Sequence, residues 1–265
     1  MYNIEFEYWK VIDLAKQAGE LQKRAFRTQN FKVSTKSSEV DMLTEVDLAC
    51  DHLITEQLKA WFPNDHILSE ELGAQFSTQK TTGQRLWIID PLDGTTNFSI
   101  GHPIFAVSIA LWKEGVPEFG VVYVPMLDEV YYAQKGLGAF RGSERLWASK
   151  GNRLSESVLA TGFPYDRATA ENNNSDNVKT MIPLVKGIRR LGAAAYDLSL
   201  VASGVYDAYW ELRLGQWDLA AGILLIREAG GFFEYSVEAG KYNVVAGSER
   251  LCKEIKNRVN LKNCD

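Results

Sequence analysis

The stretch that decides the fold is residues 87–97, which read Trp-Ile-Ile-Asp-Pro-Leu-Asp-Gly-Thr-Thr-Asn. Residues 86–89 are apolar and end in two β-branched isoleucines, a pattern that predicts a buried strand. Proline cannot continue a central hydrogen-bonded ladder, so we expect Asp90 and Pro91 to end this strand. The turn that follows carries two carboxylates, Asp90 and Asp93, directly before a glycine and two threonines.

The residue types of this turn favour a bound metal next to a bound phosphate. Carboxylates at the end of a strand suit a hard cation such as Mg2+, which prefers oxygen ligands and keeps several waters. Gly94 can adopt unusual backbone angles, and the successive amides of residues 94–96 could form a nest for an anion. The alternative is a surface turn, because Asp-Pro and Asp-Gly are common loop dipeptides, and this stretch alone leaves both readings open.

Length and composition limit the class of protein. The 265 residues allow a sizeable core, and we expect a single domain of two closely packed α/β halves with a boundary near residues 145–155. Hydrophobic residues make up 46% and charged residues 24%, an ordinary globular balance, and the net charge of −5 argues against a nucleic-acid partner. No apolar run reaches the roughly 20 residues of a membrane span, so no membrane partner is expected.

The N-terminus and the cysteines indicate the cytoplasm. Residues 1–5 lack the basic start and the apolar core of a signal peptide. Cys50, Cys252 and Cys264 are odd in number and widely spaced, which favours neither a disulfide framework nor a zinc site. We therefore expect a reduced, cytoplasmic compartment.

Two amphipathic helices are predicted near the N-terminus, at residues 5–27 and 44–61, because their apolar residues recur at helical spacing. Thr44 and Asp47 match a capping box at the start of the second helix. That role is a sufficient structural explanation of Asp47 taken alone.

Two further segments carry charged candidates. Residues 30–43 are predicted to form an exposed loop or loose hairpin with Lys36 near its tip, which either folds over a phosphate or is merely solvated. A short strand at 66–69 delivers Glu70, which is either a metal ligand or part of a solvated acidic loop.

The rest of the chain alternates between short strands and helices. The predicted strands are 105–112, 118–125, 129–135, 138–146, 158–162, 205–212, 232–235 and 243–246. The first four are separated by Gly or Pro turns and predict an antiparallel meander. Glu211 lies near the end of one strand, and Asp218, at the start of a helix, could simply be an N-cap. The absence of a strict βαβ rhythm favours a mixed α/β, layered class.

Two separated motifs resemble those of the inositol monophosphatase family. The first is Asp-Pro-Leu-Asp-Gly-Thr-Thr-Asn at 90–97, and the second is Trp-Asp-Leu-Ala-Ala-Gly at 217–222. The similarity extends over nearly the whole chain and includes residues 44–47, 69–71, 192–194 and 228–231. It implies a layered α/β/α/β/α sandwich, a homodimer, and Mg2+-dependent hydrolysis of a phosphate monoester that lithium inhibits.

The resemblance also implies roles for individual residues. The positions that match metal ligands are Glu70, Asp90, the main-chain carbonyl of Leu92, Asp93 and Asp218. The positions that match catalytic residues are Glu70 and the pair that activates the attacking water, Asp47 and Thr95. The positions that match substrate contacts are Gly94 and Thr95 around the phosphate, Ala194 and Glu211 around the alcohol, and in addition Asp93 and Asp218. Lys36 falls on the family's flexible loop, near a third metal.

Two departures from the family pattern concern the alcohol part of the substrate. Ala193 stands where many members carry Ser or Thr, and Gly215 stands where animal members have a bulkier histidine, so we expect that side of the pocket to be open. The small phosphorylated substrate is expected to be inositol 1-phosphate. Fructose 1,6-bisphosphate, histidinol phosphate and NADP stay alternative substrates, because relatives hydrolyse them. A transcription-associated regulatory protein on the same fold is the other alternative, although every metal position is intact.

Overall fold

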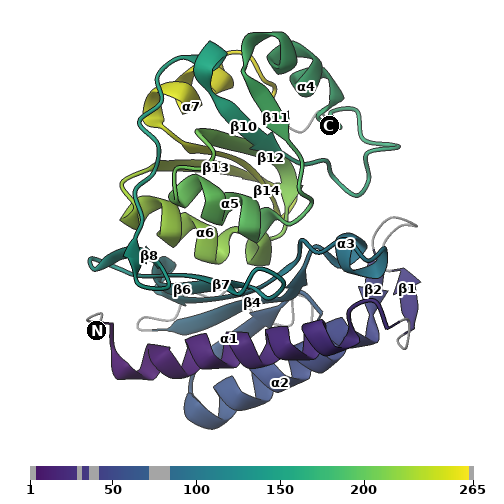
Figure 1. Ribbon diagram of the computed structural model, residues 1–265, viewed down its shortest axis with the longest axis vertical. Coiled ribbons are helices and arrows are strands. Elements are labelled where there is room, and N and C mark those ends of the chain that lie inside the picture. Colours follow the sequence, from purple (N-terminus) through teal and green to yellow (C-terminus); the bar gives the residue numbers. More distant parts are fainter. Residues whose placement is uncertain (1–3, 29–31, 36–41, 72–83, 263–265) are drawn as a thin grey trace.

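The computed structural model describes residues 4–28, 32–35, 42–71 and 84–262. These residues form two large sheets with a pair of helices between them, and a small two-stranded sheet (Figure 1). The larger sheet has seven strands in the order β3-β4-β5-β6-β7-β8-β9. They are β3 (His66–Ser69), β4 (Arg85–Asp93), β5 (Ala106–Lys113), β6 (Val116–Val124), β7 (Glu129–Gln134), β8 (Gly138–Arg141) and β9 (Glu144–Arg145). In this sheet β3 and β4 are parallel, whereas β4 to β9 pair antiparallel, which confirms the predicted meander.

Strand β4 runs through to Asp93, so the prediction that Asp90 and Pro91 end it is wrong. Its pairing with β5 shifts register between Asp90 and Asp93. This bulge takes Pro91 and Leu92 out of the regular ladder, so the missing proline N–H does not interrupt the strand. The Leu92 N–H donates instead to Asp90 Oδ1 at 3.0 Å.

Helices α1 (Phe6–Ala25) and α2 (Glu45–Trp61) cover the outer face of the larger sheet (Figure 1). Their apolar stripes pack with side chains of β4 to β7 into one buried cluster, which confirms the two helices predicted from periodicity. Between them, β1 (Val33–Thr35) and β2 (Met42–Thr44) pair as an antiparallel hairpin, and β2 leads directly into α2.

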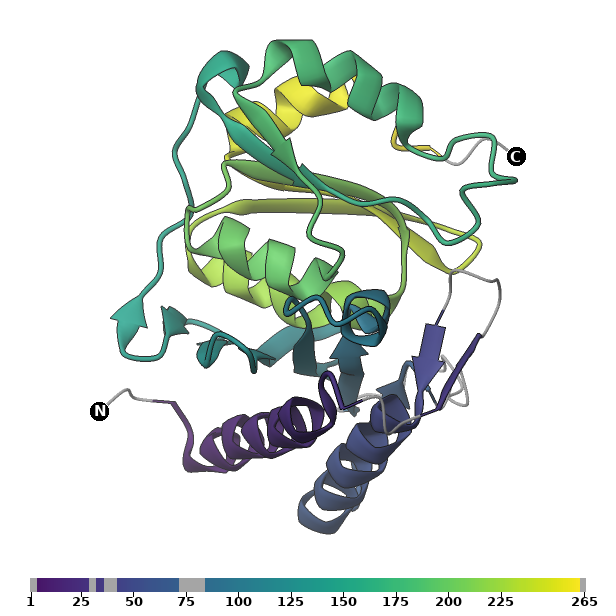
Figure 2. The same ribbon diagram turned by 45° about the vertical axis from the view of Figure 1, so that its right-hand side comes forward.

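Helices α5 (Ala194–Ala202) and α6 (Gln216–Glu228) form the middle layer, between the two sheets (Figures 1 and 2). Both are apolar on nearly all sides, as expected for helices that are covered from above and below. A Cβ atom at Gly120 of β6 would lie 3.0 Å from Ala221 Cα, so a glycine is needed where α6 crosses this strand.

The smaller sheet has the strand order β11-β10-β12-β14-β13. Its strands are β10 (Val158–Thr161), β11 (Gly187–Arg189), β12 (Ala208–Leu214), β13 (Phe232–Glu238) and β14 (Lys241–Gly247). Its outer face is covered by η1 (Leu154–Glu156), α4 (Ser175–Met181) and α7 (Glu249–Lys256), and the short η2 (Ile182–Leu184) follows α4. The resulting order of layers is α/β/α/β/α, as predicted. Strand β11 is not predicted by the sequence, because three residues are too few to show a period.

The chain leaves the larger sheet after β9, at Arg145, and enters the smaller sheet with β10, at Val158. The division of a single domain into two halves near residues 145–155 stays a prediction. In the part of the chain that the structure describes, no helix combines the length and the apolar character that a membrane crossing requires.

Candidate active site

Three carboxylates from two elements that are distant in sequence meet at one end of the larger sheet. Asp90 and Asp93 come from the bulged end of β4, and Asp218 comes from the first turn of α6. One carboxylate oxygen from each residue lies within 4.8 Å of the other two. Asp90 and Asp93 are buried, with 1% and 5% of their surface exposed. Oxygen ligands at this spacing suit a divalent cation such as Mg2+.

Glu70 follows β3 and lines the same cleft, although its carboxylate is not part of this group of three. Its backbone N–H donates to the Ile89 carbonyl at 3.1 Å, which fixes the residue beside β4. The charge of Glu70 raises the pKa of both Asp93 and Asp218. The structure therefore gathers around one cleft the four carboxylates that the sequence predicts as metal ligands.

These acids destabilise one another in their charged forms. Burial is the largest cause of the raised pKa of Asp93, which stands at about 7, although three backbone N–H groups lower it. The pKa of Asp218 is raised well above its usual range, first by burial and then by the charges of Glu70 and Asp93. A bound cation would relieve this repulsion, so the donor set fits a metal ion.

Asp93 also joins the larger sheet to the middle layer. Its Oδ1 accepts a hydrogen bond from the Ala194 N–H at 2.9 Å, and its Oδ2 accepts from the N–H groups of Ala195 at 2.9 Å and Tyr196 at 3.4 Å. These are the first amides of α5, whose own N-cap residue, Ala193, has no capping side chain. Sequence reasoning missed this contact. The signal for it was an alanine at the N-cap followed by two more alanines, a start without any capping side chain, so the cap must come from elsewhere.

Asp47 has two hydrogen-bonding partners of different kinds. It forms the predicted capping box: the Thr44 N–H donates to Asp47 Oδ2 at 2.9 Å, and the Asp47 N–H donates to Thr44 Oγ1 at 3.4 Å. The Thr95 hydroxyl lies 2.9 Å from Asp47 Oδ1 and 3.0 Å from the Leu92 carbonyl oxygen. The geometry thus accommodates both the capping interpretation of Asp47 and its pairing with Thr95.

Gly94 precedes the short helix α3 (Thr95–Ser99) and has a left-handed backbone, with φ of 90°. A Cβ atom there would lie 3.1 Å from the Ile104 carbonyl oxygen and 3.2 Å from the Gly192 carbonyl oxygen, so both conformation and space require glycine. Asn97 holds the backbone at Gly94 close to these two segments, because its Nδ2 donates to the carbonyls of Ile104 and Leu191, each at 2.8 Å. Sequence reasoning did not single out Asn97.

Glu211, on β12, faces the cleft from the opposite side. The Tyr209 hydroxyl donates to its carboxylate. Burial raises the pKa of Glu211 to about 7, while the hydrogen bond from Tyr209 and the charge of Arg190 lower it. Gly162 lies against this side chain, since an added Cβ atom would overlap the Glu211 carboxylate at 2.1 Å.

Asp218 is not the N-cap of α6, and the sequence alternative that made it one is wrong. The helix begins at Gln216 with Gly215 as its N-cap, and Asp218 reaches back to accept a hydrogen bond from the Gly215 N–H at 2.6 Å. The Trp217 ring occupies the space beside Gly215, where an added Cβ atom would lie 2.5 Å from the indole. The expectation that Gly215 leaves this side of the substrate pocket open is therefore wrong, because the Trp217 side chain fills the space.

The cleft between these residues has a volume of about 190 Å3. Its lining contains all the predicted site residues in the described part of the chain except Asp47, which reaches it through Thr95. Arg190, Arg213 and Lys241 also line it. From the sequence, the pair Arg189 and Arg190 is interpreted either as binding an acidic substrate or as pairing with acids at a subunit contact, whereas Arg213 and Lys241 are not singled out. The prediction for Lys36 lies outside the described residues.

The sequence matches a family model and several known proteins over most of its length. The sequence model of the inositol monophosphatase family matches residues 7–258. The chain is 39% identical over 253 residues to an inositol-1-monophosphatase of Mesorhizobium japonicum, covering 95% of this chain and 93% of that protein. It is 40% identical over 248 residues to the Nus factor SuhB of Pseudomonas aeruginosa, covering 91% of each.

Solved structures agree with the sequence matches. The IMPase of Thermotoga maritima superposes with a TM-score of 0.83 and 31% identity, covering 95% of both chains. The family match spans nearly the whole chain, and the relatives exceed 30% identity over nearly their full length. The chain therefore belongs to the inositol monophosphatase family of phosphatases.

Proposed function

We propose that this cleft hydrolyses the phosphate monoester of a small polyol, most favourably inositol 1-phosphate, in a reaction that depends on Mg2+. The observation that carries the proposal is the set of three carboxylates within 4.8 Å beside the Thr95–Asp47 hydrogen bond. The volume of the cleft, about 190 Å3, lies below the roughly 300–1,000 Å3 that is common for ligand pockets, and this favours a small substrate.

The residues proposed to hold the metal are Glu70, Asp90, Asp93, Asp218 and the Leu92 carbonyl. When bound there, Mg2+ supplies charge screening for the phosphate, a lowered pKa for its water, and stabilisation of the departing oxygen. The protein contributes the fixed ligand geometry, because Asp93 is held by the α5 amides and Asp218 by the Gly215 N–H. Mg2+ prefers such oxygen ligands.

Thr95 and Asp47 are proposed to orient the attacking water. The Thr95 hydroxyl can donate its single proton to Asp47 Oδ1 while its oxygen accepts a hydrogen bond from the water. The backbone at Gly94 and Thr95 is proposed to cradle the phosphate, since it opens α3 in a left-handed turn that exposes main-chain amides to a ligand.

The alcohol part of the substrate is proposed to lie between Ala194 and Glu211, which line the other side of the cleft. A carboxylate such as Glu211 accepts hydrogen bonds from vicinal hydroxyls, and this favours a polyol over an apolar alcohol. By resemblance to the family, we also propose a homodimer and inhibition by lithium. Sedimentation of the purified protein tests the first, and a lithium titration of activity tests the second.

The direct test is phosphate release from a panel of substrates with Mg2+ or with a chelator. We expect inositol 1-phosphate to be hydrolysed with Mg2+ and not with the chelator, and Asp90→Asn to abolish the activity. The panel also contains fructose 1,6-bisphosphate, histidinol phosphate and NADP. A strong preference for histidinol phosphate or NADP would contradict the assignment of inositol 1-phosphate as the substrate. Activity that persists in the chelator would contradict the dependence on Mg2+.

A second candidate function is regulatory, and the 40% identity to the Nus factor SuhB of Pseudomonas aeruginosa favours it. A regulatory role does not exclude hydrolysis in this protein, because every position proposed to bind the metal still carries an oxygen ligand. Retention of RNA polymerase or Nus factors on the immobilised protein, compared between wild type and Asp90→Asn, tests the role independently of activity. Failure to retain any of them would contradict the regulatory candidate.

A further inference from the structure

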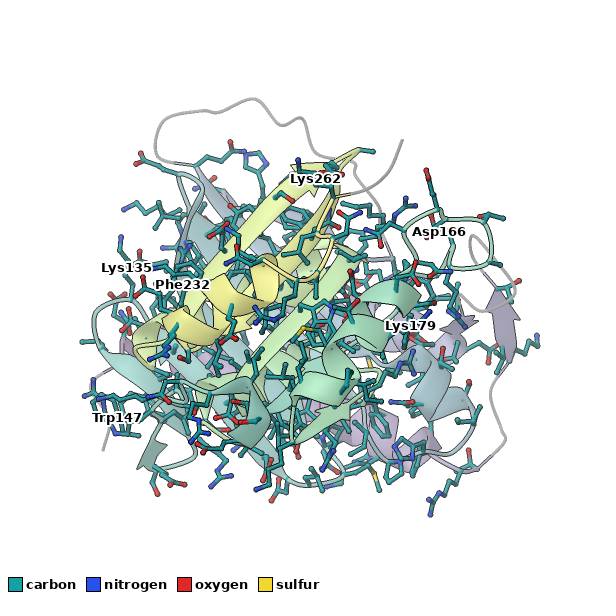
Figure 3. The ribbon with its side chains drawn as sticks, turned by 90° about the horizontal axis from the view of Figure 1, so that it is seen from above. Lys135, Trp147, Asp166, Lys179, Phe232 and Lys262 are labelled. Carbon is teal, nitrogen blue, oxygen red and sulfur yellow. The ribbon has the colours of Figure 1, made fainter. Side chains whose placement is uncertain are left out.

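A second pocket lies on the outer face of the smaller sheet and shares no lining residue with the active-site cleft. Figure 3 looks down on this face, where α7 is drawn in yellow. The pocket has a volume of about 310 Å3, and we call it the arginine pocket after the three arginines that line it: Arg153, Arg250 and Arg258. We propose that the arginine pocket binds a small organic phosphate, at a site separate from that of the substrate in the cleft.

The charge of this pocket is opposite to that of the whole chain. Its three arginines are accompanied by one carboxylate, Glu254, whereas the chain has a net charge of −5. Like charges that line one space repel one another, and an anion between them removes the repulsion. A guanidinium is planar and presents its N–H donors in a fork that matches two oxygens of a phosphate. The pocket therefore offers both the charge and the donor geometry that a phosphate group requires.

Arg250 is the arginine that the fold leaves available. Its side chain is exposed and makes no ion pair or hydrogen bond with another residue that the structure describes. It lies in the first turn of α7, where the helix dipole disfavours a cation. The stability of α7 therefore does not explain an arginine at this position, whereas an anion bound beside it would offset the unfavourable charge.

The lysines of α7 provide a contrast to Arg250. The Lys253 Nζ lies 2.6 Å from Glu249 Oε1, and Lys256 pairs with Glu234 on β13. Neither lysine lines the arginine pocket. The cation that faces the pocket is thus the one on this helix without a carboxylate partner among the described residues.

Arg258 and Glu254 continue the face of Arg250, because residues four apart lie one helical turn from each other. The Arg258 Nη2 lies 3.1 Å from Glu254 Oε1, and the Arg258 Nη1 donates to the Glu254 carbonyl at 3.2 Å. These contacts hold the Arg258 guanidinium at the pocket. They also place the pocket's one carboxylate where it competes with an entering anion.

The opposite wall, which carries Arg153, is fixed by its neighbours. The Ser248 hydroxyl donates to the Gly151 carbonyl and so joins the segment before η1 to the start of α7. A Cβ atom at Gly151 would lie 2.7 Å from Asp207 Oδ1, so this segment also runs close to the start of β12. Arg153 pairs with Glu156 at 2.6 Å, but their side chains are 65% and 64% exposed. An exposed pair of this kind contributes little, so a bound phosphate can replace the carboxylate.

Two leucines give the pocket an apolar part. Leu154 is 6% exposed and belongs to the buried cluster beneath α7, and Leu184 is 38% exposed at the end of η2. Apolar carbon beside guanidinium groups suits the carbon part of an organic phosphate. The volume lies at the lower end of the roughly 300–1,000 Å3 that is common for ligand pockets. These features favour a small molecule over a nucleic acid, which the net charge of −5 also disfavours.

The experiment measures binding of phenyl phosphate and of inorganic phosphate by isothermal titration calorimetry, with chelator and at constant ionic strength. Without a metal, the carboxylates of the cleft repel both probes, so binding there is suppressed. We expect saturable binding of both, with phenyl phosphate the tighter. Arg250→Gln should raise the Kd of both about tenfold, because charge-assisted hydrogen bonds to the phosphate are lost. Leu184→Ser should weaken phenyl phosphate alone.

Glu254→Gln should change affinity in the other direction. It removes the carboxylate that competes with the anion, so the Kd of both probes should fall. Arg250→Lys keeps the charge without the planar fork and should bind both probes with intermediate affinity.

Two variants serve as controls. Lys253→Gln removes a cation from the same helix but outside the pocket, and it should leave the Kd of both probes unchanged. Asp90→Asn alters the cleft alone and should also bind both probes as the wild type does. Thermal unfolding checks the fold of each variant. Arg250→Gln should not lower the melting temperature, since it removes a cation from the first turn of α7.

The outcomes decide the inference separately from the proposed phosphatase function, because binding is measured without metal. It is overturned by the lack of saturable binding, by equal losses in Lys253→Gln and Arg250→Gln, or by loss of binding in Asp90→Asn. Equal affinity for phenyl phosphate and inorganic phosphate would overturn the organic class of the ligand. Binding of a single-stranded RNA without binding of phenyl phosphate would assign the arginines to a nucleic acid instead.

Discussion

At the scale of single residues, Asp47 shows how one carboxylate can serve a helix and a reaction. Its Oδ2 takes part in the capping box of α2, and its Oδ1 lies 2.9 Å from the Thr95 hydroxyl. The two oxygens therefore separate the two roles. A substitution that preserves the cap while changing the second contact can distinguish between them.

Asp47→Asn is that substitution. Asp47 is the third helical residue of the capping box, with Thr44 as the N-cap, and the side-chain oxygen of an asparagine can still accept from the Thr44 N–H, so the melting temperature should change little. The side-chain NH2 group that then faces Thr95 in place of Oδ1 cannot accept a hydrogen bond from the Thr95 hydroxyl, so kcat should fall about 100-fold or more. Steady-state kinetics and thermal unfolding check both expectations, with Glu45→Gln in the same helix turn as the control. An unchanged kcat would leave Asp47 as a cap only.

Glu211→Gln tests recognition of the alcohol. It should weaken kcat/KM for polyol phosphates by about 1–3 kcal/mol, the range for a lost hydrogen bond that involves a charged group. An aryl phosphate lacks the hydroxyls and should be affected much less. The measured quantity is the ratio of the two kcat/KM values before and after substitution. A ratio that does not move would make Glu211 a structural residue.

At the scale of elements, the site depends on how α3 and α5 are fixed to β4. Asp93 caps α5 from the end of β4, and Asn97 of α3 binds the carbonyls of Ile104 and Leu191 on either side. These contacts cross the boundary between the larger sheet and the middle layer. Movement of the Gly192 turn would therefore displace Ala194 relative to the metal ligands.

Asn97→Ala should lower the free energy of unfolding by about 1–3 kcal/mol, because two enclosed carbonyls lose their donor. Asn97→Asp should be more destabilising still, because a carboxylate would face two carbonyl oxygens and has no proton to donate. Urea unfolding of the three proteins checks this order. A less destabilising Asn97→Asp would show that the donor function of Asn97 is unimportant.

At the scale of the whole molecule, stability without metal should depend on pH. The pKa values of Asp93 and Glu211 are both raised to about 7, chiefly by burial. Both groups thus bind a proton more tightly in the folded chain than in the unfolded chain. Their contribution to stability is fully present below about pH 4 and is lost as the pH rises through about 7.

Mg2+ should reverse this loss, because a cation bound to the carboxylates favours their charged forms. We expect Mg2+ to raise the melting temperature at pH 8 and to have little effect at pH 5, relative to the protein with chelator. Glu211→Gln should flatten part of the pH dependence. Melting temperatures at pH 8 that do not respond to Mg2+ would contradict a metal site at these acids.

The sequence by itself determined the elements and the local chemistry. Apolar spacing located α1 and α2, and alternation with Gly and Pro turns located the meander from β5 onward. The resemblance of the motifs at 90–97 and 217–222 to those of the inositol monophosphatase family indicated the layered fold. The neighbours Asp90, Asp93 and Gly94 suggested a metal beside a phosphate, because residues so close in sequence lie near one another whatever the rest of the chain does.

Only the tertiary structure decided how distant segments complete the site. The bulge that carries β4 past Pro91 depends on pairing with β5. The cap of Asp93 on α5 joins residues about 100 positions apart, and the Trp217 ring fills the space beside Gly215. Lys241 reaches the cleft only because β14 pairs with β12. Local sequence patterns report spacing along the chain, whereas these contacts depend on how the sheets and helices pack in space.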